Sequence, residues 1–490
     1  MFVDYEYNAG KLIVSYIDTA GKLKHKNYSW SVPKGYEVCD EKDPQRHPTF
    51  KTWDGNFVKF IPKRYPDRYA VYEFLDSLPI EDQKEIFDFN NPDIYFMDIE
   101  TEIIDEFPDA VEAKTRVLAN AIVNGNKVLL MGLKTLSEIE IKEIENGINK
   151  YFSKFDTKYI VQYIKFEDEK ELLHTLFYKL IPKMPVITGW NFEEYDWVYL
   201  VNRCRKNNLN PNVASPTGKL IKPWSKNIAN PKQQELPLHR CIVDYMDLYK
   251  KWDTAIKIKE SDRLDFVAEK LLGLKKIEYD GSLQELYEND FEKYMLYNAV
   301  DTLLVKHIHE KMRYVDIMYA ISVLSRIRMT DAFSSIRVTE GILRGPLRKD
   351  QNIVMFKQKK SEDFEEYTSD GDDNGTELEL KGGYVKEPIQ GMSLWTVVFD
   401  FASLYPTVMR QFNISPEAYK GQKISDTTCI YQGKIRNINK DDIVLLNDAV
   451  FSKKESSTKQ VLTDIYFARK TYKKKMNKAK DEYTLLEKQL

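Results

Sequence analysis

The sequence predicts a multidomain protein of mixed α/β and α+β class. Its 490 residues exceed what one hydrophobic core usually organises, so we expect about three or four domains. Short β-rich runs punctuated by Gly and Pro fill the first 90 residues. From residue 93 onward, apolar strand candidates are followed by long helical stretches. This order predicts a mixed sheet covered by helices.

The composition narrows the class of protein. Hydrophobic residues make up 42% and charged residues 30% of the chain, which is typical of a soluble globular protein. There is no apolar run long enough for a membrane span and no secretory signal pattern, so we expect a cytoplasmic protein. The 4 cysteines are scattered without a Cys-x-x-Cys pair, which argues against zinc ribbons and disulfides. A net charge of −3 leaves nucleic-acid binding open, because such binding needs only local basic patches.

Strand candidates come first along the chain. Their common feature is a short apolar or β-branched run, and they cover residues 11–16, 56–61, 94–100, 117–123, 128–133 and 159–162. The run at 94–100 contains two acids, Asp98 and Glu100. Strand side chains alternate, so both acids point to the same face. Unpaired carboxylates on an apolar strand are costly, and bound divalent cations would remove that cost. Taken alone, an ordinary pair of edge acids is the more common explanation.

Two further motifs follow at intervals of about a hundred residues. An apolar strand at 186–189 ends in a Gly turn, and Asp196 then begins a helix predicted over 197–206. Asn191, in the turn, could orient that acid or a phosphate. Farther along, Tyr297 and Asp301 are four residues apart on a predicted helix, so they share a face. Taken singly, a solvated helix face explains this last pair more often.

The order and spacing of these three motifs resemble the DEDDy 3′→5′ exonucleases. The resemblance implies an RNase H-like fold in which four acids hold two Mg²⁺ ions; these acids are Asp98, Glu100, Asp196 and Asp301. It also implies that Tyr297 positions the attacking water. Two ions about 3.5–4 Å apart can stabilise the attacking and leaving oxygens of a phosphodiester displacement.

Other polar residues near these motifs have different interpretations. Asp244 and Asp247 are interpreted as structural. Lys276 precedes Asp301 by 25 residues, where related polymerases place a lysine near the exonuclease site, although the charges around it match that pattern poorly. Residues 212–237 are either a β-hairpin that separates strands, as in relatives, or a plain surface loop.

A second resemblance begins at residue 400. Residues 395–400 are predicted to form an apolar strand that ends in Asp400. The run Asp-Phe-Ala-Ser-Leu-Tyr-Pro that starts there, followed by Asn-Ile-Ser-Pro-Glu at 413–417, resembles motif A of family B DNA polymerases, most of all those of large tailed phages. The turn after the strand would leave backbone N–H groups free to hold phosphate.

This resemblance implies a role for each motif A residue. Asp400 would bind both catalytic metal ions, and the carbonyl of Phe401 would bind one of them. The backbone of Ser403 and Leu404 would hold the incoming triphosphate. Tyr405 would exclude ribonucleotides by occupying the space of the 2′-OH.

Segments on either side of motif A extend the resemblance. The Gly-Gly linker that tracks template DNA in the family corresponds here to Gly382, Gly383 and Tyr384. The helix predicted over 464–480 carries Arg469 and Lys473 on one face. In relatives the equivalent helix of the fingers domain supplies an Arg and a Lys to the triphosphate. A solvated basic face is the alternative for this pair.

The resemblance also implies a domain plan. Residues 1–90 would form an N-terminal domain completed by 316–380, and 91–315 the RNase H-like exonuclease domain. Residues 381–455 would form part of the palm, and 456–490 the first fingers helix. Within residues 361–379 the chain is acidic and contains Gly, which is typical of a connector.

Two polymerase motifs have no counterpart in the sequence. Neither Lys-x-x-x-Asn-Ser-x-Tyr-Gly (motif B) nor Asp-Thr-Asp (motif C) occurs. Our hypothesis is a split replicative polymerase: a second chain would supply both motifs, the thumb and contact with a sliding clamp, and the completed polymerase site would hold two Mg²⁺. The substrates would be primer-template DNA, single-stranded 3′ ends and dNTPs, in the cytoplasm of a phage-infected bacterium. A truncated polymerase, a standalone 3′→5′ exonuclease with a vestigial palm, and a non-catalytic nucleic-acid-binding regulator are the alternatives.

Overall fold

The computed structural model describes residues 2–487, apart from 33, 54, 63–67, 89–91, 105, 223–234, 254–260, 355–385, 388, 393, 402 and 432. The chain forms two compact units. The first comprises Met1–Ser31 and Tyr72–Gly341, and the second comprises Val32–Val71 and Ile342–Leu490. The four-domain plan with boundaries at 90, 315, 380 and 455 stays a prediction.

The first unit is built on a six-stranded mixed sheet with the order β10-β9-β8-β7-β11-β14. The three central strands are antiparallel, and β10, β11 and β14 are parallel to their neighbours. The strands are β7 (Ile94–Thr101), β8 (Val117–Asn124), β9 (Lys127–Gly132), β10 (Ile160–Lys165), β11 (Val186–Gly189) and β14 (Cys241–Asp244). The strands expected from the sequence and the mixed sheet are therefore confirmed.

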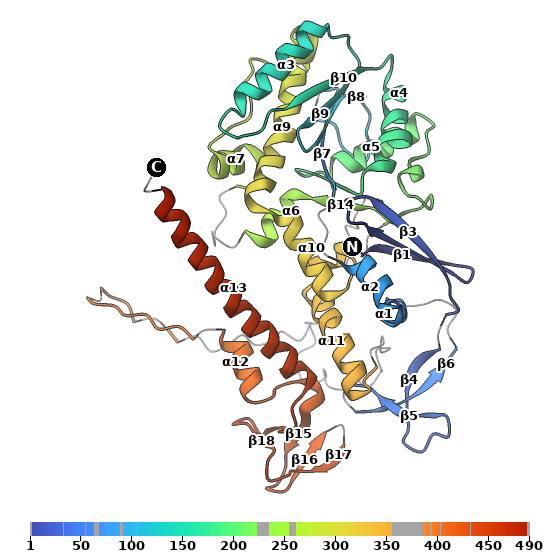
Figure 1. The fold of residues 1–490 in the computed structure, drawn as a ribbon, viewed down its shortest axis with the longest axis vertical. Helices are drawn as coiled ribbons and strands as arrows, with labels where there is room; N and C mark the ends of the chain where they lie inside the picture. The colour runs from blue at the N-terminus through green and yellow to red at the C-terminus, as the bar shows by residue number, and fades with distance from the viewer. Residues whose placement is uncertain are drawn as a thin grey trace, which may run out of the picture. The chain divides into compact units, whose positions relative to one another are not determined.

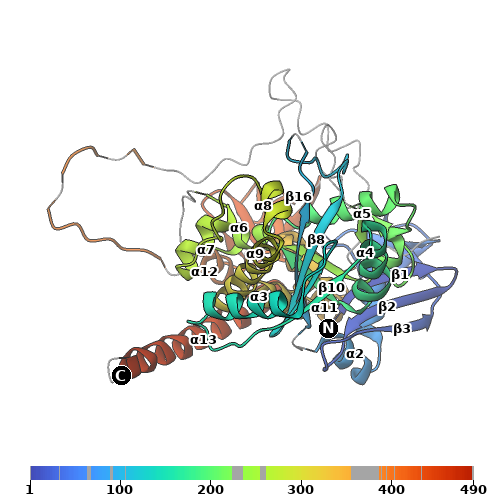
Figure 2. The same cartoon turned by 90° about the horizontal axis from the view of Figure 1, so that it is seen from above.

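Helices cover both faces of this sheet (Figures 1 and 2). On one face the buried helix α9 (Phe291–Met312) packs against β7 and β8. It is accompanied there by α3 (Glu138–Tyr151), α7 (Leu264–Leu272) and α8 (Leu283–Asn289). The other face is covered by α4 (Glu169–Thr175) and α5 (Asp196–Lys206). The Asp290 side chain accepts a hydrogen bond from Lys293 N at the start of α9 (Phe291–Met312). Such a cap satisfies one of the free N–H groups at the helix start.

The N-terminal strands of the first unit form a separate antiparallel sheet. Its strands are β1 (Phe2–Asn8), β2 (Lys11–Ile17) and β3 (Leu23–Ser29). Helix α2 (Ile80–Phe87) contacts β2, and α10 (Tyr314–Ser325) continues the chain after α9. Helix α6 (Tyr245–Trp252) directly follows β14 and contacts α10.

The second unit contains two small antiparallel sheets. The first has the order β4-β6-β5 and consists of β4 (Gly35–Cys39), β5 (Arg46–Lys51) and β6 (Phe57–Ile61). The second has the order β17-β16-β15-β19-β18 and consists of β15 (Tyr419–Lys423), β16 (Thr428–Tyr431), β17 (Lys434–Asn437), β18 (Ile443–Val444) and β19 (Ala449–Phe451). Helix α12 (Leu404–Gln411) packs on the long helix α13 (Ser457–Glu487), where Arg410 lies over Tyr466 at 4.4 Å. The helices α1 (Arg68–Ser77) and α11 (Ser335–Gln351) each span the boundary between the two units.

The strand predicted over residues 395–400 is wrong. The described residues of this run are irregular and exposed, including Trp395 (96% exposed) and Phe399 (91%). An apolar run forms a strand only where a neighbouring strand accepts its backbone hydrogen bonds, and no described strand pairs with it. Local hydrophobicity was therefore an insufficient signal at this position.

The segment 212–237 has paired ends. Strand β12 (Leu220–Ile221) pairs antiparallel with β13 (Leu236–Pro237), and residues 223–234 between them lie outside the described part. Paired ends favour the hairpin over a plain loop. In the described part of the chain, no helix is both long and apolar enough to cross a bilayer.

A buried ion pair fastens α4 to α5 on the second face of the sheet. Glu169 is only 4% exposed, and its carboxylate accepts hydrogen bonds from Arg203 Nε at 2.7 Å and Val117 N at 2.8 Å. Asn207 Nδ2 donates to the same carboxylate at 3.0 Å. Removing one partner would leave the Arg203 guanidinium buried without its counter-charge.

We therefore expect Glu169→Ala to lower the free energy of unfolding by about 3–5 kcal/mol, measured by urea denaturation. Glu167→Ala is the matched control, because the Glu167 side chain is 82% exposed in its pair with Lys165. Exposed pairs of this kind contribute about 0–1 kcal/mol. Equal losses in the two variants would contradict the prediction.

Candidate metal centre

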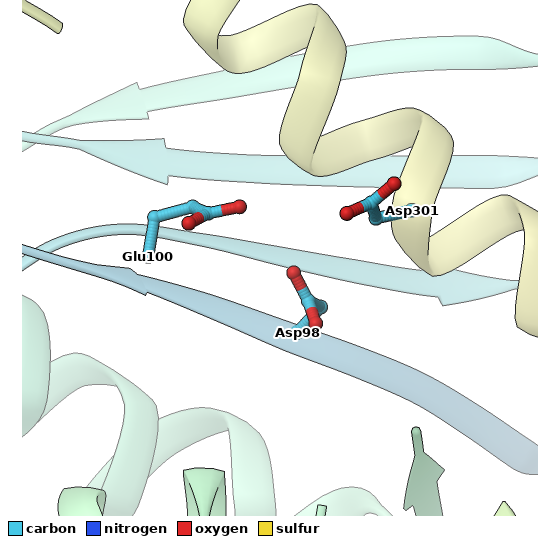
Figure 3. Close-up of side chains that lie close together, drawn as sticks. All are labelled: Asp98, Glu100 and Asp301. Atoms are coloured by element: carbon cyan, nitrogen blue, oxygen red, sulfur yellow. The ribbon is translucent and has the colours of Figure 1, made fainter. Parts of the chain in front are cut away.

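Three carboxylates converge between strand β7 and helix α9. Asp98 and Glu100 come from β7 and Asp301 comes from α9, and one ligand oxygen from each lies within 4.8 Å of the others. Figure 3 shows the three side chains directed toward one another. Asp98 and Glu100 are separated by one residue, so the pleat places both on the face that α9 covers.

Small residues on the neighbouring strand leave room for this cluster. In the β7–β8 register, Asp98 is opposite Ala121 and Glu100 is opposite Ala119. Directly opposite residues on paired strands bring their side chains into contact range. Because both alanines are fully buried, larger side chains at these positions would enter the space that the carboxylates share.

Asp196 lies beside the cluster without joining it. It is the first residue of α5, and its Oδ1 accepts a hydrogen bond from Ile99 N at 3.0 Å. A Cβ at Gly189 would lie 2.3 Å from Met97 O, so only glycine permits this close approach of β11 to β7. The structure therefore groups three of the four predicted acids and places the fourth on the backbone between Asp98 and Glu100.

The turn between β11 and α5 is organised by Asp244. Its carboxylate accepts hydrogen bonds from Asn191 N at 3.1 Å and Glu193 N at 3.3 Å, and Met246 N donates to it at 2.8 Å. Asn191 has a φ of 60°, a left-handed conformation that asparagine tolerates. These contacts agree with the structural interpretation of Asp244, and they place Asn191 in the turn that leads to Asp196.

Burial and mutual repulsion shape the titration of the four acids. Burial, together with repulsion from Asp301, raises the pKa of Asp98 to about 7, against the opposing effects of the Lys276 charge and the Asn298 hydrogen bond. Burial also raises the pKa values of Glu100 and Asp196, and nearby carboxylates add to both shifts. The pKa of Asp301 is raised by burial as well, against the opposing charge of Lys276.

The residues fit a divalent cation. Within the described part of the chain, Asp301 Oδ1 is buried and has no hydrogen-bond partner. Several carboxylates share a desolvated space with one lysine, an arrangement that is costly without further positive charge. Oxygen ligands of this kind suit hard divalent ions. Asp98, Glu100 and Asp301 would hold such an ion directly.

Two residues contact the acids more closely than the sequence indicated. Lys276 Nζ lies 2.5 Å from Asp301 Oδ2 and 3.2 Å from the Tyr297 hydroxyl. Asn298 Nδ2 donates to Asp98 Oδ2 at 2.8 Å and to Asp98 O at 3.3 Å. Asn298 was missed, although its position three residues before Asp301 on a helix was the available signal. Tyr297 is 9% exposed, and burial raises the pKa of its phenol.

The residues of the motif A resemblance are not gathered into a comparable site. Asp400 and Phe401 are exposed in the irregular run before α12, and Asp400 belongs to no three-residue group of potential metal ligands among the described residues. Ser403, with a φ of 54°, precedes Leu404 at the start of α12, where Tyr405 is 78% exposed. Farther on, α13 carries exposed Arg469 and Lys473. The predicted template contacts at 382–384 lie outside the described residues.

Comparison with known families identifies the chain. Residues 73–267 match the model of the family B DNA polymerase exonuclease domain, and residues 326–490 match that of DNA polymerase family B. The chain belongs to the family B DNA polymerases, as the sequence predicted.

Three relatives illustrate the range of similarity. The chain is 32% identical to the DNA-directed DNA polymerase of Escherichia phage RB69 over 288 residues, which cover 58% of this chain and 30% of the relative. It is 22% identical to that of Enterobacteria phage T4 over 510 residues, covering 97% and 54%. It is also 25% identical to DNA polymerase 1 of Sulfolobus acidocaldarius over 402 residues, covering 78% and 41%. The chain therefore spans about half the length of these curated relatives, or less.

The buried acids predict a pH-dependent stability of the metal-free protein. The pKa of Asp98 is about 7 in the folded state, against an ordinary value of 3.8, so the folded state holds this proton more tightly than the unfolded state. The free energy of unfolding should therefore fall as the pH rises from about 4 to about 7. Asp98→Asn should remove part of this loss and stabilise the metal-free chain at pH 7 by at least about 1 kcal/mol.

Chemical denaturation in chelator, from pH 4 to pH 8, measures both effects. Adding a divalent cation at pH 7 should stabilise the wild-type chain, because the ion binds only the folded state. The same addition should have a much smaller effect on Asp98→Asn. A variant less stable than wild type in chelator at pH 7 would contradict this account of the acids.

Proposed function

We propose that this chain is the N-terminal part of a replicative family B DNA polymerase and that its first unit is a 3′→5′ proofreading exonuclease. The observation that carries the proposal is that Asp98 and Glu100 of β7 lie close to Asp301 of α9. Asp196, from α5, adds a fourth acid beside them, where it accepts a hydrogen bond from Ile99 N of β7. Family membership supports the reaction class, because one matching region is that of an exonuclease domain.

We propose Mg²⁺ as the metal ion, bound as a pair by Asp98, Glu100, Asp196 and Asp301. Two such ions would stabilise the attacking and leaving oxygens of the phosphodiester. Asp196 would need to turn from Ile99 N toward the cluster to take part. Tyr297, next to Lys276 Nζ, would orient the attacking water through its hydroxyl. Single-stranded 3′ ends are the favoured substrate, since a paired end must first open.

The second unit would contribute the first half of a polymerase site. In this proposal Asp400 binds metal ions together with the Phe401 carbonyl, and the backbone of Ser403 and Leu404 holds the dNTP triphosphate. Tyr405 contacts the sugar. On α13, Arg469 and Lys473 contact the phosphates, and residues 382–384 track the template of the primer-template DNA.

We further propose that a second chain supplies motifs B and C, and with them the thumb and the clamp contact. The exposed apolar run at 394–401 supports a missing strand partner, because Trp395 and Phe399 are nearly fully exposed. Apolar runs of this kind are expected to be covered by another surface. A complete palm sheet would bury them at the interface between the two chains.

The exonuclease proposal predicts Mg²⁺-dependent degradation of a single-stranded oligonucleotide from its 3′ end. Asp98→Ala combined with Asp196→Ala should lower the rate by about 10³-fold, since losing metal-ion stabilisation is worth several kcal/mol. Glu102→Gln is the matched control: Glu102 lies two residues beyond Glu100 but pairs with Arg116 at 3.1 Å. Full activity in the double variant would show that these acids do not form the exonuclease site.

The second-chain proposal predicts primer extension only when this chain is co-expressed with a polypeptide carrying motifs B and C. Asp400→Asn should abolish extension and leave 3′→5′ degradation unchanged, because the two reactions use different acids. Gel analysis of one labelled primer reports both. Extension by this chain alone would refute the need for a partner.

A further inference from the structure

We infer that Asn298 and Lys276 restrict Asp98 and Asp301 to one metal-facing oxygen each, and so make the carboxylate cluster select Mg²⁺ over Ca²⁺. The inference rests on the proposed function, because it concerns the same metal centre. It assigns Asn298 as a positioning residue.

Asn298 occupies one oxygen of Asp98. Its side chain is fully buried, and Nδ2 donates to Asp98 Oδ2 at 2.8 Å and to Asp98 O at 3.3 Å. One amide group therefore holds both the carboxylate and the strand backbone, which fixes the rotation of the Asp98 side chain. Among the described residues nothing donates to the other oxygen, Oδ1, which leaves it as the available ligand atom.

Lys276 occupies one oxygen of Asp301 in the same way. Its Nζ lies 2.5 Å from Asp301 Oδ2 and is also within 3.2 Å of the Tyr297 hydroxyl, so two partners hold the ammonium in place. Asp301 is 3% exposed. Its second oxygen, Oδ1, is buried with no hydrogen-bond partner in the described part of the chain.

The two donors therefore leave a pair of single-oxygen ligands, and this arrangement favours the smaller ion. Mg²⁺ takes six ligands in near-ideal octahedral geometry, uses few carboxylates and keeps several waters. Ca²⁺ takes about six to eight oxygens and often binds both oxygens of one carboxylate. Of the three clustered acids, only Glu100 has no donor on its carboxylate among the described residues. The centre thus offers Ca²⁺ fewer protein oxygens than three free carboxylates would.

A purely structural role for Asn298 makes a different prediction. Asn298 also joins α9 to β7 through Asp98 O, and loosening that contact would weaken every divalent ion to a similar degree. Selectivity by the blocked oxygen instead changes the ratio of the two affinities, because a freed carboxylate gains a second ligand atom that Ca²⁺ uses and Mg²⁺ does not. The affinity ratio is therefore the informative quantity.

The experiment measures Mg²⁺ and Ca²⁺ dissociation constants of the full chain by isothermal titration calorimetry without DNA. The variants are Asn298→Ala, which frees Asp98 Oδ2, and Lys276→Met, which frees Asp301 Oδ2. Each should shift the preference toward Ca²⁺ by about tenfold or more, the range typical of residues that orient metal ligands. Thr302→Val is the matched control, because its hydroxyl bonds only the Asn298 carbonyl within α9, at 2.9 Å, and it should leave the ratio unchanged.

The outcomes separate this inference from the proposed function. If wild type degrades single-stranded DNA with Mg²⁺ and neither variant changes the affinity ratio, the selectivity inference is overturned and the exonuclease proposal stands. If the ratio shifts while wild type degrades no DNA, the exonuclease proposal fails instead. Lys276 lies in a non-helical segment and is 35% exposed, so Lys276→Met keeps the test decisive if Asn298→Ala does not fold. An equal loss of both affinities in Lys276→Met also overturns the inference.

Discussion

Like charges held together out of water are the constraint on which the first unit depends. Asp98, Glu100 and Asp301 share a space beneath α9, where their repulsion opposes folding. The surrounding structure must hold the acids in place against that cost. A sheet buried on both faces and a helix buried along most of its length supply the rigidity. The repulsion among these acids therefore destabilises the metal-free protein locally, and a bound divalent cation would offset that cost.

Because of this repulsion, the residues that hold the acids in position are as important to the centre as the acids themselves. Asn298 and Lys276 each satisfy one carboxylate oxygen, which lowers the repulsion without filling the centre. Asp244 holds the turn that delivers Asp196, and Gly189 lets β11 approach β7 closely enough for Asp196 to meet the backbone between the other acids. Each contact adds little by itself, but together they fix the positions of groups that would otherwise separate.

Sequence reasoning succeeded where the information was local. Alternation placed Asp98 and Glu100 on one face, and helical spacing placed Tyr297 with Asp301. The strands of the mixed sheet followed from apolar runs, and the family followed from motif order. It failed where the outcome depends on a partner: residues 395–400 have the composition of a strand, yet no described neighbour pairs with them. It also missed Asn298: helical spacing indicates that Asn298 lies near Asp301, but its hydrogen bond to Asp98 depends on how α9 packs on β7.

The alanines opposite the acids have a consequence for how this centre could change. Ala119 and Ala121 on β8 lie directly opposite Glu100 and Asp98 in the strand register. We expect a single branched residue at either position to prevent cation binding with every acid still present, because its side chain would occupy the space that the carboxylates share. Loss of the proposed exonuclease activity by this route would leave the four acids unchanged in the sequence. The small side chains of Ala119 and Ala121 are thus a second, steric requirement for the carboxylate centre, in addition to the acids themselves.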